Sequence, residues 1–397
     1  MNTVSASRYP TARIPLLASN VVAASQPLAA QAGLRMMLAG GNAVDAALAA
    51  AATLTVVEPT MNGIGGDLYA IVWDGTQLHA LNSTGASPAA WRRSRFDKYD
   101  QMPMKGWDSV TVPGQVAGWA ALSRRFGKLP FQQLFAPAVD YAERGFPVSP
   151  FVASVWSELA ALVSYQRGFA ETFLVDGRAP AVGEIWRAPG HARSLQAIAE
   201  TEGDAFYRGA LAEAMVAFSD RTGGCLSLDD LASHQPAWCE PLALQYRDYT
   251  LHELPPNGFG IAALMALGIL ENFDVRAMGR DSADAYHVQI EAMRLAFADL
   301  YAHVSDPTTM RLPVAALLDR DYLAQRARLL DPRRAGAPVP GKPRLGGTVY
   351  LTAADASGMM VSLIQSNYWA FGSGLVAPGT GIALHNRGSN FTLDRGH

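Results

Sequence analysis

Residues 333–347, which read RRAGAPVPGKPRLGG, lack hydrophobic periodicity and divide the chain into two regions. Its Pro and Gly residues interrupt helices and strands, and its basic side chains favour water, so it predicts an exposed linker. Helical patterns outnumber strand patterns before this linker, whereas residues 348–354 and 359–366 directly after it predict two strands joined by a turn. We therefore treat residues 1–347, which end in the linker, and residues 348–397 as separate regions.

Hydrophobic periodicity predicts alternating elements in the first region. Asn42 and Ser25 each stand where a side chain can cap the start of a helix. Asp74-Gly75 between two apolar runs is a strong signal for a β-hairpin. The predicted strands cover residues 21–24, 68–73 and 77–81, and the predicted helices cover residues 26–38, 43–54, 115–125, 131–144, 261–272 and 283–302.

Composition excludes several classes of protein. Hydrophobic residues make up 49% of the 397 residues and charged residues 17%, which excludes intrinsic disorder. The formal charge of -3 lacks the basic excess of a nucleic-acid-binding protein. The two cysteines, Cys225 and Cys239, cannot build a disulfide framework, which favours a reducing compartment. The most apolar run, residues 46–57, is shorter than the roughly 20 residues that cross a bilayer. We expect a cytoplasmic protein that binds neither nucleic acid nor a membrane.

Common catalytic and metal-binding signatures are missing from the sequence. It contains no GxSxG, HExxH, Walker or CxxC pattern, and its eight histidines are scattered. The glycine-rich segment 62–67, NGIGGD, departs from the GxGxxG pattern and predicts a tight turn rather than a dinucleotide loop. We therefore expect no metal ion and no nucleotide.

The junction Gly346-Gly347-Thr348 is the most informative feature for chemistry. A threonine hydroxyl is a weak nucleophile that needs an adjacent base. If the peptide bond before Thr348 were cleaved, its new α-amine would lie on the same residue, with a reference pKa of about 7.7–8.0 that suits a general base. Glycine before the threonine permits the backbone distortion that self-cleavage requires. The alternative interpretation is an ordinary threonine that opens a strand.

Over nearly its whole length the chain resembles the gamma-glutamyltranspeptidase family of N-terminal-nucleophile hydrolases. The resemblance rests on the segments AGGNAVDAALAAAATLTVVEP, NGIGGD, VTVPGQVAGW, APAVDYAERGFPVSP, LPPNGFGIAAL, AYHVQIEAMRLAFAD and GGTVYLTAADASGMMVSLIQSNYWAFGSGLVAPGTGIAL. It implies an α+β fold, a four-layer αββα sandwich. It also implies a proenzyme that cleaves itself between Gly347 and Thr348 into two associated fragments, with room for higher oligomers. Thr348 would be both nucleophile and base, acting on a small amide molecule without any cofactor.

The resemblance assigns further site residues and shows where this chain departs from the family. Ser366 takes the place of a hydroxyl that supports the nucleophile's amine. Thr84 stands where the family has an arginine that grips a substrate carboxylate, and a threonine cannot replace that charge. Asn390 stands where an aspartate receives the substrate's ammonium group, and Tyr368 where an Asn or Glu occurs. Arg387 is a candidate for presenting a positive charge to a substrate carboxylate, with a surface or turn arginine as the alternative.

These departures leave three functions open. The first is a gamma-glutamyltransferase or glutathione hydrolase. The second is an acylase-like or oxamate-type amidohydrolase, which Thr84 and Asn390 favour. The third is a non-catalytic member used for binding. The region after the linker has 50 residues, fewer than a family small subunit, and lacks the later segment with the paired serines and the oxyanion hole. We therefore expect the chain to be a fragment of a longer protein.

Overall fold

A six-stranded antiparallel sheet lies at the centre of the computed structural model, which describes residues 16–336, 348–394 and 397. The strand order is β1-β9-β10-β2-β3-β6, so the two strands after the linker are inserted between β1 and β2. Every neighbouring pair is antiparallel. The strands are β1 (Val21–Ala23), β2 (Asp67–Trp73), β3 (Leu78–Ser83), β6 (Ala237–Cys239), β9 (Val349–Ala354) and β10 (Met360–Ser366).

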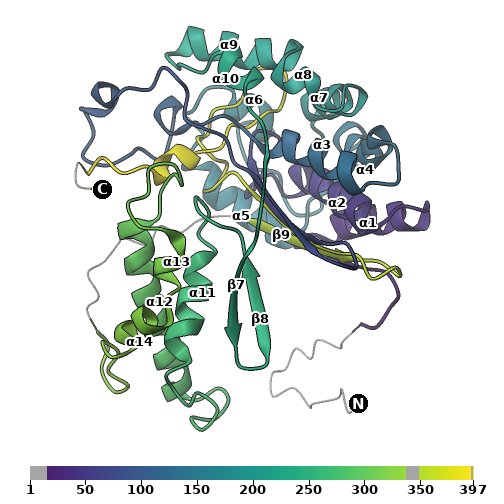
Figure 1. Cartoon of the computed structure of the whole chain (residues 1–397). Coiled ribbons are helices and arrows are strands. Elements are labelled where there is room, and N and C mark those ends of the chain that lie inside the picture. Colours follow the sequence, from purple (N-terminus) through teal and green to yellow (C-terminus); the bar gives the residue numbers. More distant parts are fainter. Residues whose placement is uncertain (1–15, 337–347, 395–396) are drawn as a thin grey trace.

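Helices cover one face of this sheet (Figure 1). Helix α2 packs on β9 and β10 and is flanked by α1 and α4, while α3 packs on β2 and β3. A further group of helices, α5 to α10, follows α4 along the chain, together with the two-stranded pair β4–β5. These elements are α1 (Pro27–Leu38), α2 (Ala43–Val57), α3 (Gln115–Phe126), α4 (Phe131–Arg144), β4 (Phe146–Pro147), α5 (Pro150–Ala160), α6 (Phe169–Phe173), β5 (Ile185–Trp186), α7 (Pro189–Glu200), α8 (Asp204–Tyr207), α9 (Ala210–Thr222) and α10 (Leu228–Ala232).

The start of α2 shows why this helix forms where the sequence predicts it. The Oδ1 of Asn42 accepts the backbone N–H of Asp45 at 3.0 Å, and the Asp45 carboxylate accepts the backbone N–H of Asn42 at 2.9 Å. All residues of α2 are buried, as its run of small side chains predicts. The predicted cap of α1 is wrong by one residue. Gln26 caps that helix, and the Ser25 hydroxyl instead donates to Glu58.

The two faces of the central sheet differ sharply in burial. Side chains on alternate positions, such as Leu68 and Leu363, are buried against the helices. On the opposite face Tyr350 is 55% exposed and Met360 is 52% exposed, and Ile364 is also exposed. Of the four predicted layers, the described residues show a helical layer and the six-stranded sheet that it covers.

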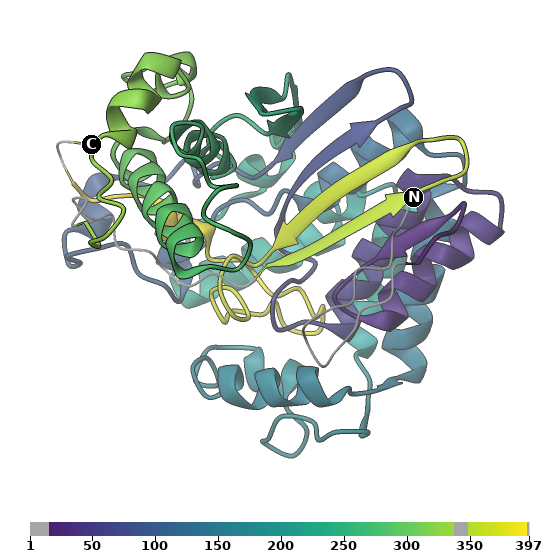
Figure 2. The same cartoon turned by 90° about the horizontal axis from the view of Figure 1, so that it is seen from below.

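A second hydrophobic core lies beside the sheet in a smaller helical unit. Helix α11 packs against α12, α14 and the hairpin β7–β8. Figure 2 shows this unit in green, separate from the helices that cover the sheet. Its elements are β7 (Leu242–Tyr246), β8 (Tyr249–Glu253), α11 (Ile261–Leu270), α12 (Ala283–His303), α13 (Val314–Leu317) and α14 (Arg320–Ala327).

Beyond these units, three short 3₁₀ helices are η1 (Arg93–Phe96), η2 (Trp107–Ser109) and η3 (Arg387–Asn390). Arg333, Arg334 and Ala335 of the predicted linker are exposed, and residues 337–347 lie outside the described part of the chain. No described helix combines the length and the apolar character needed to cross a membrane.

Candidate active site

Thr348 immediately precedes β9 and lies next to Ser366 at the end of β10. Thr348 is exposed, and its Oγ1 lies 3.1 Å from the Oγ of Ser366, within hydrogen-bond distance. The strand register explains this proximity, because Val349 pairs with Gln365 in the antiparallel ladder. The residue before one strand and the last residue of the other therefore meet. The structure brings together the two residues predicted to be catalytic.

Ser366 is held in place by the turn that follows β10. Its side chain is buried, and its Oγ accepts the backbone N–H of Tyr368 at 2.7 Å. Tyr368 has a φ of 74°, a left-handed conformation that is unusual for a bulky residue. Such backbone conformations cost energy and concentrate at functional sites, where the surrounding structure maintains them. The turn thus fixes the hydroxyl of Ser366 toward Thr348.

An ion pair lies on the other side of Ser366. Ser366 pairs with Asp67 across β10 and β2, and the Asp67 carboxylate accepts two hydrogen bonds from Arg387, at 2.5 Å from Nε and 3.0 Å from a terminal nitrogen. Burial by itself would raise the pKa of Asp67, but Arg387 and then His385 hold the pKa of this carboxyl well below its usual range. Asp67 is therefore ionised at neutral pH.

An arginine that binds a substrate carboxylate would have an unpaired charge, but the charge of Arg387 is already paired. Its guanidinium is paired with Asp67 and lies 4.6 Å from the centroid of the Tyr368 ring. The side chain keeps 20% of its surface exposed. The structure thus unites Arg387 and Tyr368, two predicted substrate-binding residues, beside the Thr348–Ser366 pair.

His385 supports this ion pair from inside the protein. Its ring is fully buried, with Nδ1 3.6 Å from the Asp67 carboxylate. Its Nε2 lies 3.0 Å from the hydroxyl of Thr111 and 3.1 Å from the carbonyl oxygen of the same residue. Asp67 therefore contacts the guanidinium of Arg387 and also the buried imidazole ring of His385.

The glycine-rich segment 62–67 positions Asp67 by letting backbones come close together. A Cβ on Gly65 would lie 2.4 Å from the carbonyl oxygen of Ala383, and one on Gly66 would lie 2.6 Å from that of Ser366. The backbone N–H of His385 also donates to the Gly65 carbonyl at 3.0 Å. The segment is a tight turn, as the sequence predicts, and it joins β2 to the residues that carry His385 and Arg387.

Thr84 lies just after β3 in a network of neutral groups. Its backbone N–H and its hydroxyl contact the Asn82 side-chain oxygen at 3.0 and 2.8 Å, and the Asn257 amide nitrogen donates to its hydroxyl at 3.0 Å. Burial raises the pKa of neighbouring Tyr69 to about 12, so this phenol stays neutral. No carboxylate or cation contacts the Thr84 side chain among the described residues.

Asn390 and Gly347 are the remaining predicted site residues. Asn390 is exposed at the end of η3, one turn after Arg387. Gly347, the residue before the predicted scissile bond, lies outside the described part of the chain. No group of three His, Cys, Asp or Glu side chains that could hold a metal ion occurs in the described ranges.

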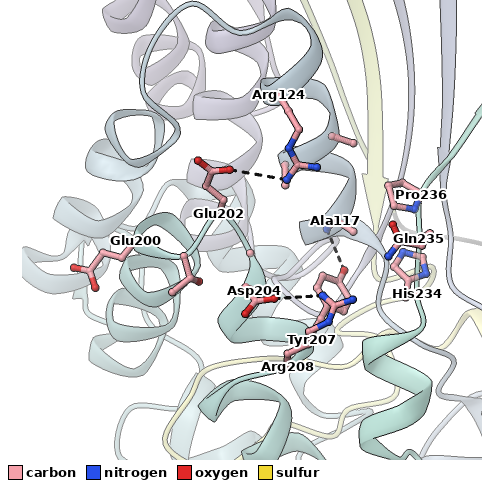
Figure 3. Close-up of a pocket in the computed structure, with 14 residues that line it drawn as sticks. Ala117, Arg124, Glu200, Glu202, Asp204, Tyr207, Arg208, His234, Gln235 and Pro236 are labelled. Carbon is pink, nitrogen blue, oxygen red and sulfur yellow. Dashed lines mark hydrogen bonds and ion pairs between the residues drawn. The ribbon is translucent and has the colours of Figure 1, made fainter.

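A pocket of about 510 Å³ is lined by other residues (Figure 3). It is formed by α3, by the segment from the end of α7 through α8, and by residues 234–236. Its charges are largely paired with one another, since Arg208 contacts Asp204 at 3.3 Å and Arg124 lies 3.9 Å from Glu202. None of the predicted catalytic residues lines it. We therefore place the candidate active site at Thr348 and not in this larger pocket.

Comparison with known proteins identifies the family to which this fold belongs. A family model described as gamma-glutamyltranspeptidase matches residues 29–396. The chain belongs to the gamma-glutamyltranspeptidase family. A cephalosporin acylase structure from Bacillus halodurans covers 100% of the chain with a TM-score of 0.90 and 45% identity, and 75% of that structure is matched. This confirms the α+β fold of N-terminal-nucleophile hydrolase type.

Two curated relatives of this gamma-glutamyltranspeptidase family member carry different names. A glutathione hydrolase-like YwrD proenzyme of Bacillus subtilis is 37% identical over 93% of the chain and 71% of its own length. An oxamate amidohydrolase proenzyme of Klebsiella pneumoniae is also 37% identical, with the same two coverages. The chain therefore spans about 71% of each of these relatives and belongs to a family of amidohydrolases and acyltransferases.

Sequence reasoning missed Asp67 and His385. The only available signal for Asp67 was its place directly after Gly65-Gly66 in NGIGGD, at the start of a strand. His385 stands two residues before Arg387, a spacing that by itself indicates no contact with a residue more than 300 positions away.

Proposed function

We propose that this chain is a self-cleaving N-terminal-threonine amidohydrolase with Thr348 as its nucleophile. The observation that carries the proposal is the 3.1 Å contact between the Thr348 and Ser366 hydroxyls at an exposed strand entrance. The family membership supports it, because the named relatives are proenzymes. A hydroxyl buried among apolar side chains could not act as a nucleophile toward an external substrate.

The first reaction cleaves the chain itself. The Thr348 Oγ attacks the carbonyl carbon of Gly347, the peptide C–N bond breaks, an ester C–O bond forms, and the nitrogen takes the hydroxyl proton. Water then hydrolyses the ester, which leaves a carboxylate on Gly347 and a free α-amine on Thr348. Ser366 is positioned to hydrogen-bond with the new threonine terminus.

The second reaction acts on an external amide. The α-amine of Thr348 accepts the hydroxyl proton while Oγ attacks the amide carbon, and the amine product leaves with that proton. The acyl group remains on Oγ as an ester until water, or another amine, removes it. The proton transfers of this cycle use only the hydroxyl and the α-amine of Thr348, with the Ser366 hydroxyl beside them.

Replacing Thr348 tests the first reaction. Purified wild-type protein should separate into two bands on a denaturing gel, with masses that place the cut between Gly347 and Thr348. Thr348→Ala should stay in one piece, while Thr352→Ala on the same strand should still be cut. A wild-type chain that remains intact after long incubation would favour a non-catalytic binding protein instead.

An acylase-like or oxamate-type specificity is the second candidate for the external substrate. The observation in its favour is that Thr84 has only neutral partners and Arg387 is already paired with Asp67. A γ-glutamyl head group carries an ammonium and a carboxylate, and it would meet few unpaired charged side chains near Thr84 and Arg387. Glutathione hydrolase activity would instead need a further cation close to Thr84.

A substrate panel separates these two specificities. We expect hydrolysis of oxamate or of a glutaryl amide to exceed that of a γ-glutamyl anilide by at least tenfold in kcat/KM. The cleaved wild-type protein is the enzyme, and uncleaved Thr348→Ala is the blank. Preferential turnover of the γ-glutamyl anilide would assign the chain to the glutathione hydrolases.

A further inference from the structure

A second pocket, of about 340 Å³, has an unusual balance of charge. It lies beside η1 and η2, the loop before α6 and the end of α9, and none of the predicted catalytic residues lines it. Four cationic side chains line it but only one carboxylate, that of Asp108. The lining residues are Arg95, Lys98, Tyr99, Lys105, Gly106, Trp107, Asp108, Tyr165, Gln166, Arg167, Thr222, Gly223 and Leu375.

The single carboxylate is already shared by two of the cations. Asp108 accepts hydrogen bonds from Arg95 Nε at 2.5 Å and from the Tyr99 hydroxyl at 2.9 Å, and it lies 3.0 Å from Lys98 Nζ. Arg95 also donates to the Gly223 carbonyl at 2.9 Å. Asp108 therefore has little capacity left to neutralise the other two cations of the pocket.

Lys105 is half-buried and has only uncharged partners among the described residues. Its Nζ donates to the carbonyl oxygens of Ala370 and Gly372 at 3.1 and 3.0 Å and lies 4.1 Å from the centroid of the Trp369 ring. Burial lowers its pKa to about 7. Carbonyl dipoles and a ring stabilise an ammonium less than a carboxylate does, so its charge is poorly compensated.

Arg167 contributes the fourth cation without any ion pair in the described structure. Its side chain is exposed and appears in no hydrogen bond or salt bridge that the described residues form. A planar guanidinium offers several donors in one plane, which suits the oxygens of a carboxylate or phosphate. Lys105 and Arg167 both line this pocket, whose volume of about 340 Å³ is large enough for a small molecule, and neither has a carboxylate partner among the described residues.

We propose that this pocket binds a small oxyanion, a carboxylate or phosphate group carried by a small molecule, at Lys105 and Arg167. Arg95 and Lys98 add a positive field, since two cations share the one carboxylate. The bound anion would supply the charge that Lys105 lacks. None of the predicted catalytic residues lines the pocket, so the proposal does not rest on the proposed cleavage before Thr348.

Calorimetric titration with inorganic phosphate and with acetate tests the site. Each titration is run at constant ionic strength with chloride as the balancing anion. We expect saturable binding to the wild type and about tenfold weaker binding to Arg167→Gln, because a charge-assisted hydrogen bond is lost. Arg276→Gln removes an exposed arginine of the helical unit and should bind like the wild type.

The two anions distinguish the source of the oxyanion. Tighter binding of phosphate would identify a phosphate-bearing ligand, and tighter binding of acetate a carboxylate-bearing one. Heats no different from those of chloride would overturn the proposal. Equal binding by Arg167→Gln and Arg276→Gln would also overturn it, because the anion would then bind elsewhere.

The pH dependence of acetate binding tests the role of Lys105. Acetate keeps one charge between pH 6 and 8, and so do the other groups around the pocket: the pKa of Asp108 is lowered, the pKa values of Lys98 and Tyr99 are raised, and arginine stays protonated. Lys105 alone changes charge, because its pKa is about 7. Acetate affinity should fall about tenfold from pH 6 to 8. Lys105→Met should bind weakly at both pH values, and a pH-independent wild type would remove Lys105 from the site.

Discussion

At the scale of single residues, the pair Asp67–Arg387 dominates the candidate active site. Both members approach each other from segments 320 positions apart, and the Asp67 side chain has only 2% of its surface exposed. A buried carboxylate without its cation would shift toward its neutral form, and a buried guanidinium without its carboxylate cannot. The pair therefore ties η3 to the start of β2, beside the Thr348–Ser366 pair.

Removing the carboxylate should be costly. We expect Asp67→Asn to lower the free energy of unfolding by about 3–5 kcal/mol, because it leaves the Arg387 charge unpaired in a largely buried place. Urea denaturation followed by circular dichroism measures the change. Asp97→Asn breaks the exposed pair with Arg93 and should cost less than about 1 kcal/mol. Similar losses for the two variants would contradict the importance of the buried pair.

Acid should remove the same stabilisation. The folded-state pKa of Asp67 is depressed, so the contribution is fully present above the unfolded value of about 4 and is lost as the pH falls below it. The difference in unfolding free energy between wild type and Asp67→Asn should therefore shrink when urea titrations are repeated from pH 6 down to pH 3. A constant difference across this range would show that Asp67 is not ionised through its pair with Arg387.

At the scale of elements, helix α2 depends on its first turn. Asn42 caps the helix through Asp45, and its side-chain nitrogen also donates to the Phe126 carbonyl at 2.6 Å. Asn42→Ala should cost about 1–2 kcal/mol in unfolding free energy, because both hydrogen bonds are lost at a buried site. Asn42→Ser keeps a capping oxygen and should lose less. Thermal and urea unfolding of the two variants gives the comparison, and equal losses would mean that the cap contributes little.

The sequence predicts elements well where local signals agree. Helix α4 matches the predicted residues 131–144, and the hairpin β2–β3 follows from Asp74-Gly75. The hairpin β7–β8 was not predicted, because Arg247 adopts the left-handed φ of 55° in a turn without glycine or asparagine. The helices from α5 to α10 also have no predicted counterpart. Local start signals were nevertheless present for two of them, because Ser149 caps α5 just before Pro150 and Ser227 and Asp230 form a capping box at the start of α10.

The candidate site shows the same division between local and distant information. Thr348 and Ser366 lie on one hairpin, 18 residues apart, so a strand-turn-strand prediction is enough to place them together. The contact between Asp67 and Arg387 joins residues 320 positions apart, and no pattern within either segment specifies the partner. Hydrophobic periodicity predicts the local secondary structure of a segment. It does not predict which distant residue a side chain contacts once the sheet has assembled.

At the scale of the whole molecule, the strands after the linker are the middle of the sheet. β9 pairs with β1 and β10, while β10 also pairs with β2, and α2 packs on both strands. Leu351 and Leu363 are buried in the main hydrophobic core. A cut before Thr348 would therefore break the chain without breaking any of these contacts, and removing the smaller fragment would expose the centre of the core.

This arrangement predicts that the two fragments stay together after cleavage. Cleaved protein should elute from a sizing column as one peak that contains both fragments, and only denaturant should separate them, because buried apolar surface and two strand ladders join them. A Thr348→Ala chain with a protease recognition sequence in place of residues 340–346, cut by that protease, provides the same break without self-cleavage. The fragment 348–397 eluting by itself in native buffer would show that the sheet does not hold the two regions together.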